Sequence, residues 1–112
     1  MAFKKYIYGG RNPNAKVSIN AEGILSFNSA AMRQFGIPIY KSCTLYYDEE
    51  TQTVGIKLSN RKEDIKMTHC NNGRITVRLS GFLRTFNLSI NKLQQFPIIE
   101  KDGMLQIPLK EN

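Results

Sequence analysis

The side chains in this sequence that could do chemistry are cationic, and they lie near predicted turns and short helices. The 112 residues include 16 Lys and Arg against nine Asp and Glu, for a formal net charge of +7. Most of the acids fall in expected hairpin turns, which leaves a positive face free to meet a polyanion. Such a face binds phosphate, because Lys and Arg neutralise and hydrogen-bond phosphate oxygens. The candidate nucleic-acid-binding residues are Lys5, Arg11, Lys16, Arg33, Arg74, Arg78 and Arg84.

The residue types that enzymes use are sparse. His69 is the single histidine, and its neighbour Cys70 would point to the opposite face of a strand, which disfavours a Cys–His dyad. Together with Cys43, these residues lack the spacing of a zinc site. The run 48–50 is better explained as a solvated acidic turn than as a calcium site, and no glycine-rich phosphate loop is present. The sequence predicts a protein that is not an enzyme and has no metal or cofactor.

An internal repeat defines the elements that must position the cations. The segments 16–58 and 67–112 each have the pattern of strand, turn, strand, short helix and closing hairpin, and a shift of 51 residues aligns their helices and last strands. One ββαββ unit of this size buries too little apolar surface to fold alone, so the two units should interlock around one shared core. The prediction is a mostly-β fold with two short helices, preceded by a basic flexible arm at 1–15 and joined by a linker at 59–66.

Local signals support both copies of this unit. Glycine at positions 23 and 73 supplies the positive φ that a tight hairpin turn requires. Asn28 or Ser29 should cap the first helix, which ends at Gly36. Asn87 takes the place of that glycine after the second helix, because asparagine also tolerates the left-handed conformation.

The last hairpin of the second copy is less regular. The expected strands are 92–99 and 104–109, separated by a turn at 100–103. Pro97 and Pro108 have no backbone N–H, so these strands should be edges or be irregular at those points.

Neither a membrane nor an oxidising compartment is indicated. The two cysteines do not form a disulfide framework, and no apolar run is long enough for a transmembrane helix or a signal peptide. We therefore expect a cytoplasmic protein without a membrane partner.

The first unit resembles the AbrB/SpoVT family. The resemblance is carried by the run VSINAEGILSFNSAAMRQFGI at 17–37, by LYYDEE at 45–50 and by VGIKL at 54–58. That family forms a swapped-hairpin β-barrel from two ββαββ units, normally on two chains, and a tandem pair in one chain is similar to the arrangement in MraZ proteins. The resemblance implies a pseudo-dimeric swapped-hairpin β-barrel.

The same resemblance implies non-catalytic binding of double-stranded DNA by a transcriptional regulator. The positions that match the family's DNA contacts are Arg33, Arg74 and Arg84. The arginine that the family has after the first turn glycine is Ile24 here, with Glu22 just before that glycine, so the two halves of a DNA face should be unequal. Arg33 and Arg84 lie late in short helices, where a cation also complements the helix dipole. The arm at 1–15 could enter a minor groove, stack on bases or be disordered.

A protein-binding module is the alternative function. Tyr40, Tyr46 and Tyr47 must leave at least one ring exposed, because alternate strand residues face opposite ways. An exposed tyrosine beside the acidic turn could contact another protein, and the basic charge would favour an acidic partner. Both a monomeric pseudo-dimer and a homodimer fit the repeat.

Overall fold

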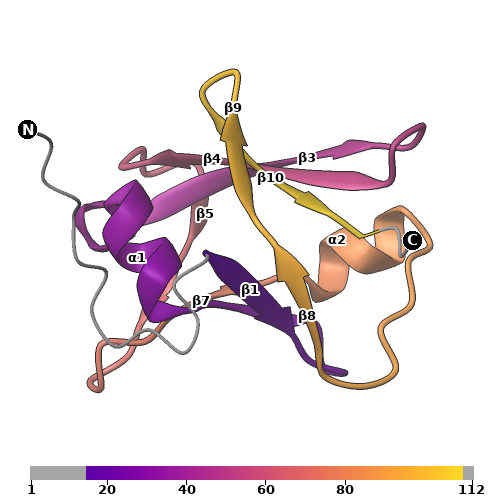
Figure 1. Cartoon of the computed structure of the whole chain (residues 1–112), viewed down its shortest axis with the longest axis horizontal. Helices are drawn as coiled ribbons and strands as arrows, with labels where there is room; N and C mark the ends of the chain where they lie inside the picture. The colour runs from indigo at the N-terminus through magenta and orange to yellow at the C-terminus, as the bar shows by residue number, and fades with distance from the viewer. Residues whose placement is uncertain (1–14, 110–112) are drawn as a thin grey trace, which may run out of the picture.

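The computed structural model describes residues 15–109, which form two antiparallel five-stranded sheets flanked by two short α-helices (Figure 1). The mostly-β class with two helices that the sequence predicts is therefore confirmed. Residues 1–14, which include most of the predicted basic arm, and residues 110–112 lie outside the described part of the chain.

Sheet A, the lower sheet in Figure 1, has the strand order β6-β7-β2-β1-β8. Its strands alternate between core and outward residues, as the period of two in β1 and β2 predicts. The strands are β1 (Lys16–Ile19), β2 (Ile24–Phe27), β6 (Thr68–His69), β7 (Ile75–Arg78) and β8 (Gln94–Pro97).

Sheet B lies above it and has the order β5-β3-β4-β10-β9. The long β3–β4 hairpin forms one side of this sheet, and β10 joins it along β4. The strands are β3 (Ser42–Asp48), β4 (Thr53–Ser59), β5 (Ile65–Lys66), β9 (Ile99–Lys101) and β10 (Met104–Pro108).

Two chain segments contribute to both sheets. Only Met67 separates β5 in sheet B from β6 in sheet A, and only Ile98 separates β8 in sheet A from β9 in sheet B. Both residues are buried, and their N–H groups donate to the carbonyl oxygens of Lys41 and Ala15. The last two residues of the predicted linker 59–66 thus form strand β5.

The irregularity predicted at Pro97 is confirmed, because β8 is an edge strand and the chain leaves sheet A after this residue, which cannot donate to a ladder. The predicted extent 92–99 is wrong, since β8 begins only at Gln94. The turn predicted at 100–103 is also wrong in extent. Strand β9 continues to Lys101, and the turn is the pair Asp102–Gly103. Both turn residues have positive φ, 56° and 74°, as a two-residue hairpin requires.

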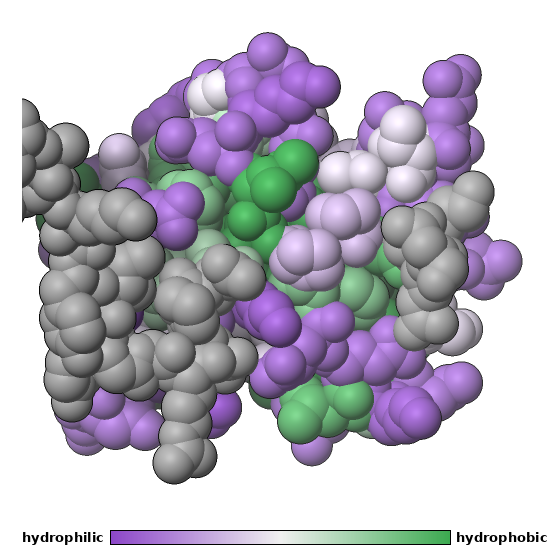
Figure 2. Space-filling view, viewed as in Figure 1, coloured by the Kyte–Doolittle hydropathy of each residue, from purple (hydrophilic) through white to green (hydrophobic). Residues whose placement is uncertain are grey.

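The core fills the space between the sheets. The side chains with 0% exposure come from strands of both sheets and from the ends of both helices, including Val17, Ile19, Leu25, Ile37, Val54, Ile56, Leu79 and Ile107. Figure 2 shows apolar side chains reaching the surface over strands β8–β10 in the middle of this view, between two hydrophilic margins. Both sheets therefore bury their inner faces against one core.

The helix ends follow the sequence signals. Helix α1 (Ser29–Phe35) is capped by Asn28, whose Oδ1 accepts hydrogen bonds from the N–H groups of Ala31 at 2.8 Å and Lys16 at 3.1 Å. It ends at Gly36 in the left-handed conformation, before a 3₁₀ turn η1 (Ile37–Ile39). Helix α2 (Ser80–Thr85) is followed by Asn87 at φ 57°. The caps predicted at Asn28, Gly36 and Asn87 are confirmed.

The central strand pair of each sheet joins the two predicted units. In sheet A, β2 pairs with β7 so that Ser26 faces Thr76, and in sheet B, β4 pairs with β10 so that Gly55 faces Gln106. In each case the facing residues are about fifty positions apart, close to the repeat period, as in isologous pairing between two copies. Each unit therefore completes a sheet of the other.

The two turn glycines give a matched pair of substitutions. Gly23 (φ 81°) and Gly73 (φ 88°) have the same conformation, but a Cβ on Gly23 would lie 3.0 Å from the Ser80 Cα, whereas a Cβ on Gly73 meets nothing within 4 Å. The Gly23 carbonyl oxygen also accepts a hydrogen bond from the Leu79 N–H at 2.7 Å. This bond holds the turn against the start of α2, so the turn cannot move away from Ser80 to make room for a Cβ. We expect Gly73→Ala to lower the free energy of unfolding by about 1 kcal/mol and Gly23→Ala by about 2–3 kcal/mol in urea titrations. Equal losses would contradict the close approach to α2.

Candidate nucleic-acid interface

The outer face of sheet A, formed by the side chains that alternate with its core residues, carries a row of short polar groups. Cross-strand pairing places each member directly opposite the next. The row crosses all five strands in the order Thr68, Thr76, Ser26, Ser18 and Gln95. Hydroxyl and amide groups of this kind bind phosphate and sugar oxygens in protein–nucleic acid complexes. This surface is therefore suited to contact the sugar–phosphate backbone of a nucleic acid.

Cationic residues lie on both sides of this row, toward the two ends of the strands. Lys16 begins β1 and Arg74 directly precedes β7, so the two residues lie on either side of the end of β2, where the chain enters α1. Arg78 faces Ile24 at the other end of the β2–β7 pair and is exposed. By strand alternation all three side chains are on the outer face. The structure thus brings three of the predicted residues together.

The other predicted residues are placed differently. Arg33 and Arg84 are exposed in the last turns of α1 and α2, which lie on opposite sides of the molecule (Figure 1). Lys5 and Arg11 lie outside the described residues. Arg33 and Arg84 flank the polar row rather than belong to it.

Arg84 shares a shallow groove with Glu22. The groove lies between the β1–β2 turn and α2, and its lining also includes Ser80, Asn87 and Asn91. This carboxylate partly offsets the positive charge of Arg84. The flank at α2 is therefore less suited to phosphate than the end that holds Lys16 and Arg74.

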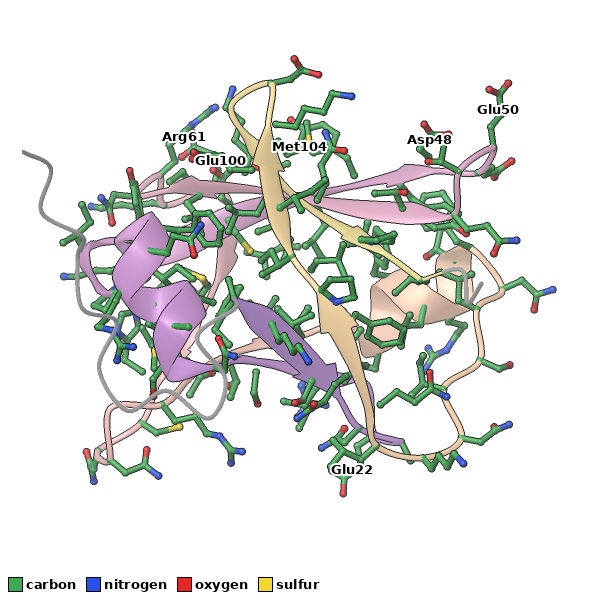
Figure 3. All side chains as sticks on the ribbon, viewed as in Figure 1. Glu22, Asp48, Glu50, Arg61, Glu100 and Met104 are labelled. Atoms are coloured by element: carbon green, nitrogen blue, oxygen red, sulfur yellow. The ribbon has the colours of Figure 1, made fainter. Side chains whose placement is uncertain are left out.

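The charges of the described chain are divided between the two sheets. We define the sheet-A half as residues 15–37 and 67–98, and the sheet-B half as 38–66 and 99–109. The sheet-A half holds six Lys and Arg and one acid, Glu22, whereas the sheet-B half holds six Lys and Arg and seven acids. Figure 3 shows Asp48, Glu50 and Glu100 on the sheet-B side and Glu22 on the other. The net positive charge of the described residues thus comes from the sheet-A half.

The cations of the sheet-A half form no ion pair with an acid of the described chain. Within residues 15–109 the one ion pair joins Arg61 to Glu63 at 2.7 Å, in the sheet-B half. An exposed pair of this kind contributes little to stability. Lys16, Arg74 and Arg78 therefore have their charges available for a ligand.

The residues considered for catalysis or metal binding are held in structural contacts. His69 Nε2 lies 2.9 Å from the carbonyl oxygen of Tyr40, and linking β6 to the start of the β3 segment is a sufficient role for it. Cys43 is fully buried, and both cysteines are free thiols. No group of three His, Cys, Asp or Glu side chains in the described residues could hold a metal ion.

Burial, and to a lesser extent the charge of Asp64, raises the pKa of the Cys43 thiol to about 11 from 9.0. Because thiolate is the reactive form, we expect a thiol reagent at about pH 8 to modify Cys70 and to spare Cys43 until the protein unfolds. The unfolded thiol ionises near 9 and the folded one near 11, so between these pH values the unfolded state binds fewer protons. The free energy of unfolding should then fall as pH rises. Mass spectrometry of the modified chain, with Cys70→Ser as control, checks the reactivity. Rapid labelling of Cys43 in the folded protein would contradict this burial.

The polar row on the outer face of sheet A was not predicted from the sequence. Its signal is present in the alternation of KVSI at 16–19, ILSF at 24–27 and ITVR at 75–78, where each strand puts a Ser or Thr between buried residues. Only the pairing of these strands shows that their hydroxyl groups are neighbours.

Comparison with known proteins gives no match to a family model, a curated protein or a solved structure. The described helices are too short to cross a membrane.

Proposed function

We propose that this chain is a non-catalytic protein that binds double-stranded DNA through the outer face of sheet A, as a transcriptional regulator of the AbrB type. The observation that carries the proposal is the position of Lys16, Arg74 and Arg78 around an acid-free row of hydroxyl and amide groups. The charge division between the two sheets supports it, because the acids of the sheet-B half would repel a phosphate backbone.

The physical basis of binding is release of counterions from the duplex. Each cation that neutralises a phosphate displaces condensed counterions, so affinity falls as salt rises. Lys16, Arg74 and Arg78 supply the central contacts in this proposal, and Arg33 and Arg84 supply flanking ones. Lys5 and Arg11 are proposed to add further phosphate contacts.

The fold that we propose for this function is a pseudo-dimeric swapped-hairpin β-barrel. Its pseudo-twofold axis would pass through the Ser26–Thr76 and Gly55–Gln106 pairs, and the segments around Met67 and Ile98 would close the two sheets into one barrel. Under this symmetry the equivalent of Arg74 is Ile24. The DNA face is therefore asymmetric, with the second unit supplying two of its three central cations, Arg74 and Arg78.

The experiment that tests this function is fluorescence anisotropy with labelled mixed-sequence duplex DNA at two salt concentrations. The seven proposed phosphate contacts predict a slope of log K against log salt of about −6. Steep salt dependence supports the proposal and justifies a search for a preferred site. Absence of binding at low salt contradicts it.

A protein-binding module is the second candidate, and the exposure of Tyr46 favours it. Tyr46 is 47% exposed on sheet B, where it lines a groove together with Asp48, Thr51, Met104 and Gln106. Aromatic side chains at the rim of such a groove are common in protein interfaces. An acidic partner would instead use the cationic sheet-A half. DNA binding that survives Tyr46→Ser would show that this groove is not part of the DNA interface.

We also propose that the protein acts in the cytoplasm. Two free thiols, one of them buried, fit a reducing compartment. The proposed oligomeric state of the protein is a monomeric pseudo-dimer, with a homodimer as the alternative. Mass photometry or sedimentation distinguishes the two.

A further inference from the structure

A second cationic groove lies on the sheet-B half, at the start of β3. It has a volume of about 520 Å³ and is lined by Ile39, Lys41, Ser42, Asn60, Lys62 and Lys66. Three lysines therefore border one groove on the half of the molecule that holds most of the acids.

The pairing of β3 positions the lysines. Lys66 in β5 faces Ser42 across the ladder, and Lys41 directly precedes β3. Lys62 comes from the loop between β4 and β5, which folds back over the same strand end. Residues distant in sequence thus converge on one groove.

The other polar groups of the groove are able to donate hydrogen bonds. Asn60 Oδ1 accepts a hydrogen bond from the Lys41 N–H at 2.9 Å. The NH₂ group of the same side-chain amide takes no part in this bond and is able to donate to a ligand. Ser42, which also lines the groove, is only 3% exposed. The Ser42 hydroxyl and the Asn60 amide are neutral groups that can donate to an anion bound in this groove.

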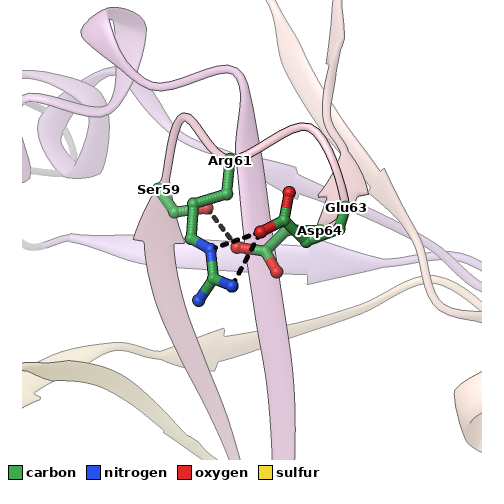
Figure 4. A network of polar contacts seen from close by, with 4 residues as sticks. All are labelled: Ser59, Arg61, Glu63 and Asp64. Carbon is green, nitrogen blue, oxygen red and sulfur yellow. Dashed lines mark hydrogen bonds and ion pairs between the residues drawn. The ribbon is translucent and has the colours of Figure 1, made fainter.

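The nearest acids of the loop are engaged by other partners (Figure 4). Asp64 accepts a hydrogen bond from the Ser59 hydroxyl at 2.5 Å, and Glu63 accepts two from the Arg61 guanidinium, at 2.9 and 2.7 Å. Neither carboxylate lines the groove. Among residues 15–109, Lys41, Lys62 and Lys66 form no ion pair.

We propose that this groove binds the phosphate chain of a di- or triphosphate. Three ammonium groups in one groove repel each other, and a compact anion of about three charges removes that repulsion while accepting their hydrogen bonds. Ile39, with 70% of its surface exposed, offers an apolar surface beside the anion for an attached organic group. The ligand is either free polyphosphate or a nucleoside triphosphate.

The test is isothermal titration calorimetry of the full chain with sodium tripolyphosphate at low salt. The variant Lys62→Gln/Lys66→Gln is compared with Lys57→Gln/Lys101→Gln, which removes the same charge from positions that do not line the groove. Loss of two charge-assisted contacts should lower affinity at least ~10-fold in the first variant and less than ~2-fold in the second. Equal losses in both variants, or no binding by the wild-type chain, would overturn the proposal.

Three further titrations sharpen the result. Citrate has a similar charge without phosphate, and binding as tight as that of tripolyphosphate would overturn a phosphate site. ATP binding tighter than tripolyphosphate identifies a nucleotide as the source, whereas equal affinity identifies the phosphate chain alone. Duplex DNA affinity should stay unchanged in Lys62→Gln/Lys66→Gln. A parallel loss of DNA and tripolyphosphate binding would overturn a separate site and assign the groove to the DNA interface.

Discussion

Replacing Lys16, Arg74 and Arg78 together by Gln is expected to lower the affinity for duplex DNA about 100-fold at low salt. The three side chains surround the polar row on the outer face of sheet A, and none of them has an ion-pair partner within the described chain. Each lost contact to a charged phosphate costs on the order of 1 kcal/mol, which together corresponds to this factor. The slope of log K against log salt should become shallower by about 3 units. Anisotropy titrations over a range of salt measure both quantities.

The matched control is Lys41→Gln/Lys57→Gln/Lys101→Gln, which removes the same charge from the sheet-B half. We expect less than a ~5-fold effect from it, because long-range attraction is screened within about a Debye length. The flanking variant Arg33→Ala/Arg84→Ala should have an intermediate effect. A loss in the sheet-B control as large as that in the sheet-A variant would mean that net charge alone binds DNA. Unchanged thermal unfolding shows that the variants are folded, since all the altered side chains lie outside the core.

Local signals in the sequence predicted local structure well. Asn28, Gly36 and Asn87 fixed the helix boundaries, and the glycines at 23 and 73 fixed the turns, because these residues act through their own backbone conformation or a hydrogen bond within a few positions. The alternating runs in β1 and β2 place the buried residues Val17, Leu25 and Phe27 at every second position.

Features that depend on distant partners could not be predicted in the same way. The change of sheet at Met67 and at Ile98 is set by which strands pair on either side; Pro97 signals an irregularity before Ile98, but nothing local indicates that the chain passes into the other sheet. For the same reason the sequence identified the cations but not their neighbours. Lys16 and Arg74 are far apart in the chain and meet only because both strands border β2. The lysine groove depends in the same way on the fold of the loop between β4 and β5.

Separating the two units is expected to abolish folding, which is the largest stability effect that the structure predicts. A chain cut between Lys62 and Glu63 divides the central pair of both sheets, since β7 and β10 leave with the second fragment. Leu25 and Ile56, both 0% exposed in the whole chain, would lie on strands that have each lost one of their two partners, and would face water. Fragments of this size bury too little surface to offset their conformational entropy. Each fragment alone should lack a cooperative transition by circular dichroism, and mixing them should restore it.

The matched control inserts a flexible Gly/Ser linker at the same position instead of a cut. Doubling a loop costs only about 0.6 kcal/mol, so the lengthened chain should unfold cooperatively at nearly the wild-type urea concentration. Fragment 1–62 could also pair with itself through β2 and β4, but that association depends on concentration and is lost on dilution. A cooperative transition that persists in a diluted, monomeric fragment would contradict the shared core. Recovery on mixing, together with tolerance of the inserted linker, would show that the two units need each other's strands but not a short connection.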